Sequence, residues 1–443
     1  MRALLPRGVA AAAVAATLAL PAPAIAAVET GHNPNDLPTE SCFWTGPFTA
    51  SNPKTNYAFP GTEINYWGAK FATPLGAELT LAGRFAHARF QSLNAYVSNG
   101  TSTNSLADVD TKPDKGSTNP YVVGNRRDLA KSKRRYTVTV EPTAVPANPA
   151  RNTLYAEPDP AGDAYQDILY RVYVPDKGRD LAGDGGVPKP TLRLPDGTVL
   201  EGQALCDALN ANHDYRGQLL PQSSYDQLVN WPGKDPATNP AEDPLVFEKF
   251  FNLNYTLAGY RTQAEQDATD ATPTGTQYNN NDARYMTGAF AFAFGELLVL
   301  RGKLPTFPKT LNGAKKMPGG QLREWDMCVI ESLVTTRTWR CLFDEQIPID
   351  SRRRYTIVVG PKRDRPDNAK GKCGIAWLPA DPEGDGAGRP DVGTLLTRNI
   401  LPDKKFKQSS FDVLVPHTAA EVMGPYYPRG SYESKAEFED RGC

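Results

Sequence analysis

Two arginines are the charged residues with the strongest chemical signal in this sequence. Arg171 and Arg398 each stand inside an apolar run that alternates as a β-strand does. A buried guanidinium needs a partner, because burying an unpaired charge is costly. One interpretation is structural: Arg171 pairs with Asp108, and Arg398 pairs with Asp344. The other is a contact to a carboxylate or a sugar oxygen of a ligand, since guanidinium binds planar anions through two hydrogen bonds.

Two acidic turns are the second candidate site. The pattern Asp-Pro-x-Gly-Asp occurs twice, with its carboxylates at Asp159 and Asp163 and again at Asp381 and Asp385. Clustered carboxylates on a turn offer the hard oxygen ligands that calcium takes. Neither turn has the spacing of an EF-hand loop, so a solvated hairpin turn is the simpler interpretation. No cofactor is therefore predicted, and calcium is the ion that these turns would hold.

Aromatic residues could form a platform on which a sugar stacks. Most of the six tryptophans lie in or beside predicted strands, which favours packing in the core. Trp231 precedes a Pro-Gly loop and is the tryptophan whose exposure is to be tested. Trp67 and Tyr170 are further candidate ligand-binding residues, because an internal repeat of the chain replaces them with Met286 and Thr397.

Histidine and the common catalytic motifs give no clear signal. The four histidines, His32, His87, His213 and His417, have no metal-binding spacing, and the sequence has no nucleophile elbow, phosphate-binding loop or dinucleotide-binding motif. A Ser/His/Asp triad needs no proximity in sequence, so enzymatic activity is left undecided.

A repeated segment indicates how the chain is organised. Residues 134–140 recur as residues 353–359 with five of seven identities, 219 positions later. At the same offset, residues 66–83 match residues 285–302 at seven of eighteen positions. Such self-similarity indicates an ancient duplication.

Alternation within the repeated segment separates a buried face from an exposed one. The period of two places Tyr136 and Tyr355 with the buried residues. The arginines that precede each tyrosine, at 134–135 and 353–354, lie where the strand begins and are expected to be solvated.

Many short strands separated by turns predict a mainly β protein. We expect two duplicated antiparallel β-sandwich (jelly-roll-like) domains with a partly helical connector. Further strands are predicted at 77–83, 88–97, 152–156, 168–174, 190–194, 296–301, 322–331, 338–347, 373–378 and 411–416, and helical segments at 202–212, 223–229 and 244–251. The predicted organisation is a signal peptide (1–26), an extended N-terminal segment (27–59), a first sandwich repeat (60–200), the connector (201–278, with loops at 233–243 and 262–281) and a second repeat with a C-terminal strap (279–443).

The N-terminus and the cysteines predict export. Arg2 and Arg7 precede a twelve-residue apolar run, and a small-residue motif at 24–26 predicts cleavage after Ala26. An even number of cysteines in an exported chain indicates three disulfides. The cysteines are Cys42, Cys206, Cys328, Cys341, Cys373 and Cys443. Cys328 and Cys341 lie on neighbouring predicted strands and are expected to pair, whereas the other pairings stay open.

Charge and hydropathy exclude some partners. The formal net charge is -1 and no basic patch occurs, so a nucleic-acid partner is not expected. No apolar run reaches the length of about 20 residues that a membrane span requires. The sequence does not determine the oligomeric state or the extracellular ligand.

Four motifs support a resemblance to known proteins. They are residues 66–69, 83–89, 135–138 and 170–176. In these motifs the chain resembles a group of uncharacterised secreted proteins from actinomycete-type bacteria with tandem jelly-roll-like domains of unknown function. The resemblance extends to Cys328, Cys341 and Cys373. It implies the fold and the export of the chain, and it supplies no catalytic residues.

Two classes of function follow from these observations. The first is an extracellular binding or interaction protein whose ligand, a glycan or a small molecule, lies on a sheet face or in the cleft between the repeats. The alternative is a secreted hydrolase or lyase that uses carboxylate, arginine and tyrosine chemistry. Either site is expected where the two repeats differ.

Overall fold

The computed structural model describes residues 39–97, 100–159, 164–213, 215, 219–274 and 278–443. The predicted signal peptide, His32 and Asp163 lie outside these residues. The fold is mainly β, as predicted, and its strands form four sheets. None of the helices in the described part of the chain combines the length and the apolar character needed to cross a membrane.

The N-terminal half of the chain forms two sheets. Sheet 1 has the strand order β1 (Thr45–Phe48), β2 (Ile64–Phe71), β8 (Gln166–Pro175), β4 (Ala88–Tyr96) and β5 (Ser102–Ala107). Sheet 2 has the order β10 (Val199–Leu200), β9 (Lys189–Arg193), β3 (Glu78–Arg84), β6 (Arg135–Glu141) and β7 (Thr153–Tyr155). Neighbouring strands are antiparallel except for the parallel pair β6 and β7.

The C-terminal half forms the other two sheets. Sheet 3 has the order β11 (Glu248–Lys249), β12 (Ala283–Ala291), β18 (Val392–Ile400), β14 (Glu324–Ile330) and β15 (Thr338–Phe343). Sheet 4 has the order β17 (Ile375–Pro379), β16 (Arg354–Gly360), β13 (Leu297–Lys303) and β19 (Arg429–Glu433), with β16 and β17 parallel. The α-helices are α1 (Gly202–Ala208), α2 (Gln222–Val229), α3 (Leu253–Ala258), α4 (Gln263–Asp267), α5 (Ala419–Met423) and α6 (Lys435–Glu439).

Register identifies corresponding positions in sheets 1 and 3. In sheet 1, Arg171 on β8 lies between Tyr66 on β2 and Ser92 on β4. In sheet 3, Arg398 on β18 lies between Tyr285 on β12 and Asp326 on β14. Tyr66 therefore corresponds to Tyr285, Arg171 to Arg398, and Ser92 to Asp326.

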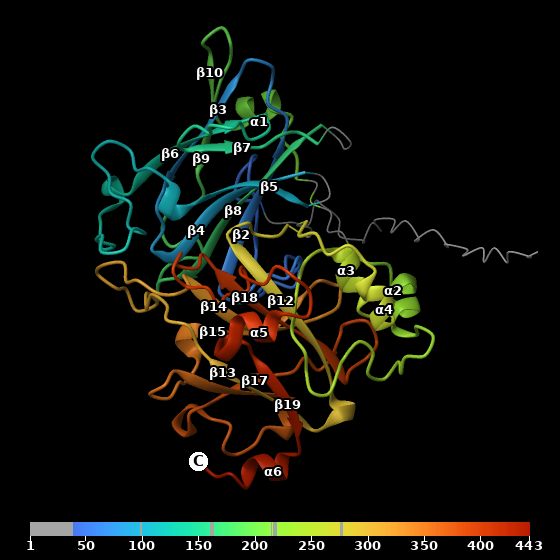
Figure 1. Ribbon diagram of the computed structural model, residues 1–443. Helices are drawn as coiled ribbons and strands as arrows, with labels where there is room; N and C mark the ends of the chain where they lie inside the picture. Colours follow the sequence, from blue (N-terminus) through green and yellow to red (C-terminus); the bar gives the residue numbers. More distant parts are fainter. Residues whose placement is uncertain (1–38, 98–99, 160–163, 214, 216–218, 275–277) are drawn as a thin grey trace, which may run out of the picture.

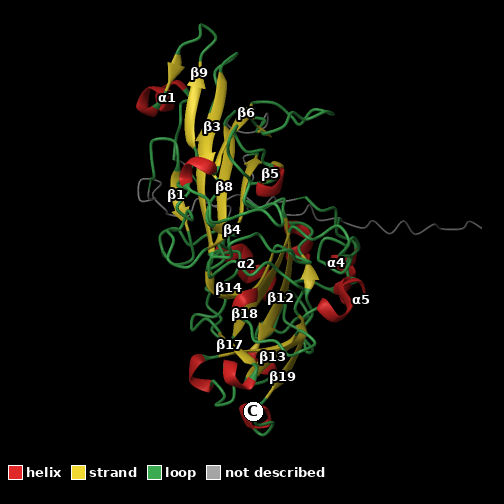
Figure 2. Ribbon diagram, turned by 90° about the vertical axis from the view of Figure 1, so that its left-hand side faces the viewer, coloured by secondary structure: helices red, strands yellow, loops and turns green. Residues whose placement is uncertain are grey.

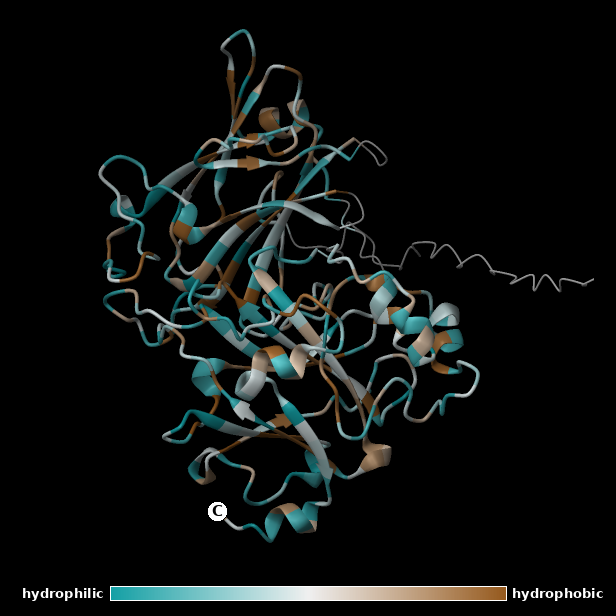
Figure 3. Cartoon of the chain, viewed as in Figure 1, coloured by the Kyte–Doolittle hydropathy of each residue, from teal (hydrophilic) through white to brown (hydrophobic). Residues whose placement is uncertain are grey.

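The four sheets are stacked in the order 2, 1, 3, 4 (Figures 1 and 2). One apolar core lies between sheets 1 and 2, another between sheets 3 and 4, and a third joins the opposite faces of sheets 1 and 3. Sheets 1 and 3 are therefore covered on both faces, which explains why every residue of β4 and β14 is buried. Figure 3 shows hydrophobic colours recurring along the strands and hydrophilic colours on many of the peripheral loops.

Several predicted elements differ in the structure. Residues 411–416, predicted as a strand, form turns and irregular structure, and the strand that pairs with β13 near the C-terminus is β19. Residues 244–251 are not helical and contain the short strand β11, whereas helix α4 lies inside the predicted 262–281 loop. Cis peptide bonds precede Pro240 and Pro244.

Three disulfides join the cysteines. The predicted Cys328–Cys341 pair is confirmed and links β14 to β15. The two pairings that the sequence leaves open are Cys42–Cys206 and Cys373–Cys443.

The repeated segment confirms one prediction and corrects another. Tyr136 and Tyr355 are buried, as the alternation predicts. Arg134 is buried rather than solvated, because its guanidinium donates to the carbonyl oxygen of Phe85. Arg353 is partly buried, and its guanidinium donates to the carbonyl oxygen of Leu304 at 2.9 Å.

Candidate functional site

A cavity of about 130 Å³ lies between sheets 1 and 3. Arg171, Arg398, Tyr66, Tyr285, Phe59 and Tyr278 are among the residues that line it. A cavity of about 150 Å³ in an apolar core accommodates benzene, so this one has room for a ligand of similar size. Both predicted arginines thus reach the same cavity, one from each half of the chain.

Among the described residues, Arg171 has no acidic partner in contact. Its guanidinium donates to the hydroxyl of Tyr96 and to the carbonyl oxygen of Tyr278. It also lies 5.5 Å from the ring centroid of Tyr66, a cation–π distance. Within the described part of the chain no carboxylate forms an ion pair with it, so the predicted pairing with Asp108 is wrong.

Arg398 is held by a carboxylate. Its Nη1 donates to Oδ2 of Asp326 at 2.6 Å, and both side chains are almost completely buried. Its Nη2 donates to the carbonyl oxygen of Phe59 at 2.5 Å. The predicted partner, Asp344, pairs with Arg89 instead.

One substitution between corresponding positions explains this difference. Asp326 on β14 lies directly across from Arg398, and on β4 the corresponding residue across from Arg171 is Ser92. A serine hydroxyl cannot neutralise a guanidinium. Arg171 acts electrostatically on Asp282, whose carboxylate accepts a hydrogen bond from Ser105 and makes no ion pair with the arginine.

Phe59 and Tyr278 have the same unusual backbone. Both have a positive φ, 53° and 55°, and each presents its carbonyl oxygen to an arginine from the other half of the chain. A non-glycine residue in this conformation is strained, and such strain is often found at binding sites. Both segments thus contribute to the lining of the cavity.

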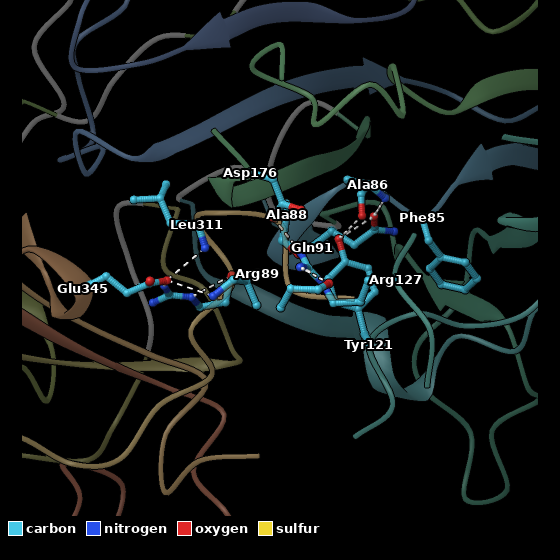
Figure 4. A network of polar contacts seen from close by, with 12 residues as sticks. Phe85, Ala86, Ala88, Arg89, Gln91, Tyr121, Arg127, Asp176, Leu311 and Glu345 are labelled. Carbon is cyan, nitrogen blue, oxygen red and sulfur yellow. Dashed lines mark hydrogen bonds and ion pairs between the residues drawn. The ribbon is translucent and has the colours of Figure 1, made fainter. Parts of the chain in front are cut away.

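Reciprocal ion pairs join sheets 1 and 3 beside the cavity. Arg89 on β4 pairs with Asp344 and Glu345 after β15, and Arg323 before β14 pairs with Asp108 after β5. Figure 4 shows Arg89 directed toward Glu345, which also accepts from a backbone amide. Each half supplies one arginine and one aspartate to its neighbour, the pattern of an isologous interface.

Three carboxylates form a second polar group at this junction. Glu63, which precedes β2, meets Glu324 and Asp326 of β14, and one oxygen of each lies within 4.8 Å of the others. Burial raises the pKa of Glu63 to about 8, with the charge of Asp326 adding to the shift. Burial also raises the pKa of Glu324, and Asp326 and Glu63 raise it further. These residues are not among the candidates predicted from the sequence. The available signal was the presence of Glu324 and Asp326 on alternate positions of a predicted strand.

The predicted aromatic residues do not join the cavity. Trp67 and Tyr170 are buried in the core between sheets 1 and 2, with their rings 5.8 Å apart. Trp231 is half-buried, and the guanidinium of Arg261 lies 4.8 Å from its ring centroid.

The predicted acidic turns are separate from the cavity. Asp385 is buried and bonded to Arg389 and to the hydroxyl of Tyr225, so this carboxylate organises its turn and is not solvated. Asp381 is also buried, and its Oδ1 accepts a backbone N–H of the same turn. Asp159 lies at the edge of the described residues. None of the three belongs to the described groups with metal-binding geometry.

The described histidines lie in three different environments. His87 is half-buried, and burial lowers its pKa to about 4. His213 contacts Thr45 through Nδ1. His417 is exposed and has its Nδ1 3.1 Å from a carboxylate oxygen of Glu248.

Comparison with known proteins gives limited similarity. No protein-family model matches the sequence, and no curated protein matches it. An uncharacterized protein from Burkholderia cenocepacia is 12% identical with a TM-score of 0.49, over 90% of this chain and 84% of that chain. A protein from Vibrio parahaemolyticus is 11% identical with a TM-score of 0.35, over 85% and 90% of the two chains. Function must therefore be inferred from the chemistry of this chain itself.

Proposed function

We propose that this protein is an extracellular binding protein that holds a small organic anion in the cavity between sheets 1 and 3. The observation that carries the proposal is the contrast between the two arginines of the cavity. Asp326 neutralises Arg398, whereas Arg171, across from Ser92, has no carboxylate in contact within the described part of the chain. A bound carboxylate would form an ion pair with Arg171, as Asp326 does with Arg398.

The cavity lining defines the chemical class of the ligand. Guanidinium recognises a carboxylate through parallel hydrogen bonds, and such charge-assisted bonds are strong when water is excluded. The rest of the lining includes tyrosine and phenylalanine rings and the aliphatic side chains of Ile64, Ile330 and Leu396. The proposed ligand is therefore a monocarboxylate with a small apolar body about the size of one ring.

Export of the chain is part of the proposal. Three disulfides are typical of proteins that fold in an oxidising compartment. The predicted signal peptide at 1–26 would direct the chain there, and the resemblance to secreted actinomycete-type proteins fits the same location.

We also propose that the two halves are copies of one sandwich unit. The support is a set of matching contacts. Phe85 and Arg134 exchange backbone and side-chain hydrogen bonds, and Leu304 and Arg353 do the same 219 positions later. Strand order is shared as well: β2–β8–β4–β5 in one half and β12–β18–β14–β15 in the other.

Calorimetry with small carboxylates tests the ligand proposal. Benzoate and isovalerate are the probes, and benzamide is the neutral control. We expect the carboxylates to bind and benzamide not to bind. Ser92→Asp places a carboxylate across from Arg171 and should weaken binding of the anion at least about tenfold, which is about 1.4 kcal/mol. The matched variant Ser92→Asn introduces a side chain of about the same volume as aspartate but without its charge, and it should retain binding.

Three outcomes contradict the proposal. They are an absence of carboxylate binding, equal affinity for benzoate and benzamide, and unchanged affinity in Ser92→Asp. A parallel assay with ester and glycoside substrates tests the alternative class. Turnover that disappears in Ser92→Asp would replace the binding proposal with a hydrolase or lyase at the same cavity.

A further inference from the structure

The carboxylates of Glu63, Glu324 and Asp326, named here the carboxylate cluster, have the geometry of a cation site. One oxygen from each residue lies within 4.8 Å of the others. Calcium binds oxygen ligands at about 2.3–2.6 Å, so two oxygens on opposite sides of one ion are about 5 Å apart. A single ion at the centre would therefore contact all three residues without a large movement of the strand.

Glu324 is the member of the cluster that most needs a ligand. Its side chain is completely buried, and neither carboxylate oxygen has a hydrogen-bond partner among the described residues. Oε1 of Glu63 is likewise without a partner in this part of the chain. A buried carboxylate without partners is costly, and a coordinated cation satisfies both its charge and its lone pairs.

The neighbouring arginines do not balance the charge of the cluster. Arg398 is bonded to Asp326 and to no other cluster member. Arg89, the other cation that acts on Glu324, is already engaged by Asp344 and Glu345. Five carboxylates thus share two guanidinium groups, so these arginines cannot balance the charge of all five carboxylates in their ionised form.

The corresponding positions of sheet 1 show that the strand does not need these acids. Ser92 occupies the position of Asp326, and Phe90, two residues earlier on β4, occupies that of Glu324. Phe90 packs in the core between sheets 1 and 3 as an ordinary apolar residue. A strand in this position can therefore be buried without carboxylates, and the two on β14 require another explanation.

We infer that Glu63, Glu324 and Asp326 bind one calcium ion at the junction of sheets 1 and 3. All the donors are hard oxygens, and no histidine or free thiol belongs to the group, which disfavours zinc. Glu63 is the partly exposed member of the cluster, whereas Glu324 and Asp326 are buried. Because Glu63 precedes β2 and the other two ligands lie on β14, the ion joins the two halves of the chain. This inference does not depend on the organic anion proposed above.

Calorimetry and thermal unfolding of the disulfide-bonded chain test the calcium site. The protein is dialysed against EDTA and titrated with calcium chloride. We expect one ion per chain and a rise of the melting temperature with calcium concentration. Glu324→Gln and Glu63→Gln should each weaken binding at least about tenfold, since even outer-shell changes cost about 10–100-fold. Asp381→Asn, which alters a buried acidic turn outside the cluster, is the matched control and should bind as the unaltered chain does.

The melting temperatures of the calcium-free proteins distinguish loss of calcium binding from loss of folding. Glu324→Gln removes a buried carboxylate, so without calcium it should unfold at the same temperature as the unaltered chain or higher. Loss of calcium binding in that folded variant supports the site. The inference is overturned if the unaltered chain binds no calcium, because Glu63 and Glu324 then retain protons. Unchanged binding in Glu324→Gln, or loss of binding in Asp381→Asn alone, overturns it as well.

Discussion

The guanidinium of Arg89 is bonded to the carboxylate of Asp344 across the junction between sheets 1 and 3, and both side chains are completely buried. Replacing Arg89 by alanine leaves a buried carboxylate without a cation. We expect Arg89→Ala to lower the free energy of unfolding by about 3–5 kcal/mol, as measured by urea denaturation. Arg126→Ala, which removes one partner of an exposed pair, is the control and should change stability little. Equal effects of the two substitutions would show that the buried pair is not structural.

Stability should depend on the protonation of Asp282. Burial raises its pKa from 3.8 to about 6. Between about pH 4 and pH 6 the folded state therefore retains a proton that the unfolded chain has released. The stability that this proton contributes is complete below pH 3.8 and is lost as the pH rises through 6. Asp282→Asn does not titrate, so it should gain stability relative to the unaltered chain across this window, by up to about 3 kcal/mol.

Urea denaturation at pH 4, 5, 6 and 7 measures this difference. A comparison between variant and unaltered chain cancels the titration of the other groups, including His87. A difference in stability that is constant from pH 4 to pH 7 would mean that Asp282 does not retain its proton in the folded state.

Two glycines should be intolerant of even a methyl group. Gly302 lies across from Tyr355, and a Cβ at this position would lie 2.6 Å from the tyrosine hydroxyl. Gly83 lies across from Tyr136, and a Cβ at Gly83 would lie even closer to the tyrosine side chain. We expect Gly83→Ala and Gly302→Ala each to cost about 1–3 kcal/mol through overpacking. Gly319→Ala is the control, since its nearest contact would be 3.7 Å away. Equal melting temperatures of the three variants would contradict overpacking at Gly83 and Gly302.

The disulfides should differ in what they contribute to stability. Cys373 and Cys443 are separated by 70 positions, and Cys328 and Cys341 by 13. In the chain-entropy model the longer loop stabilises by about 4 kcal/mol and the shorter one by about 3. Replacing both Cys373 and Cys443 by serine should therefore lower the urea midpoint more than a conservative double replacement at 328 and 341. The reverse order would mean that packing around Cys328 outweighs loop closure.

Most of the strands could be predicted from the sequence because the hydropathy pattern of a strand lies within a few neighbouring residues. Residues 135–141 alternate between buried and more exposed positions along β6, and residues 168–174 form the largely apolar run of β8 around Arg171. The pattern fails at 411–416, where Val413 is buried but Leu414 and Val415 are exposed. Alternation does not reveal that β16 and β19 already occupy both sides of β13.

The candidate site could be predicted only in part. Arg171 and Arg398 stand out because a charge inside an apolar run is visible in the sequence. Their partners are not visible, because Tyr278 and Phe59 reach the arginines from the other half of the chain. Glu63 and Glu324 are separated by 261 positions, and only the packing of sheet 1 on sheet 3 brings them together.

The two halves of the junction belong to one polypeptide, and this connection has a consequence for their chemistry. Identical subunits in a symmetric dimer would carry the same residue on both sides, so Ser92 and Asp326 could not face Arg171 and Arg398 in one molecule. A single chain permits that asymmetry. It also makes docking of sheet 1 on sheet 3 unimolecular, so the cavity between them persists at any dilution of the protein.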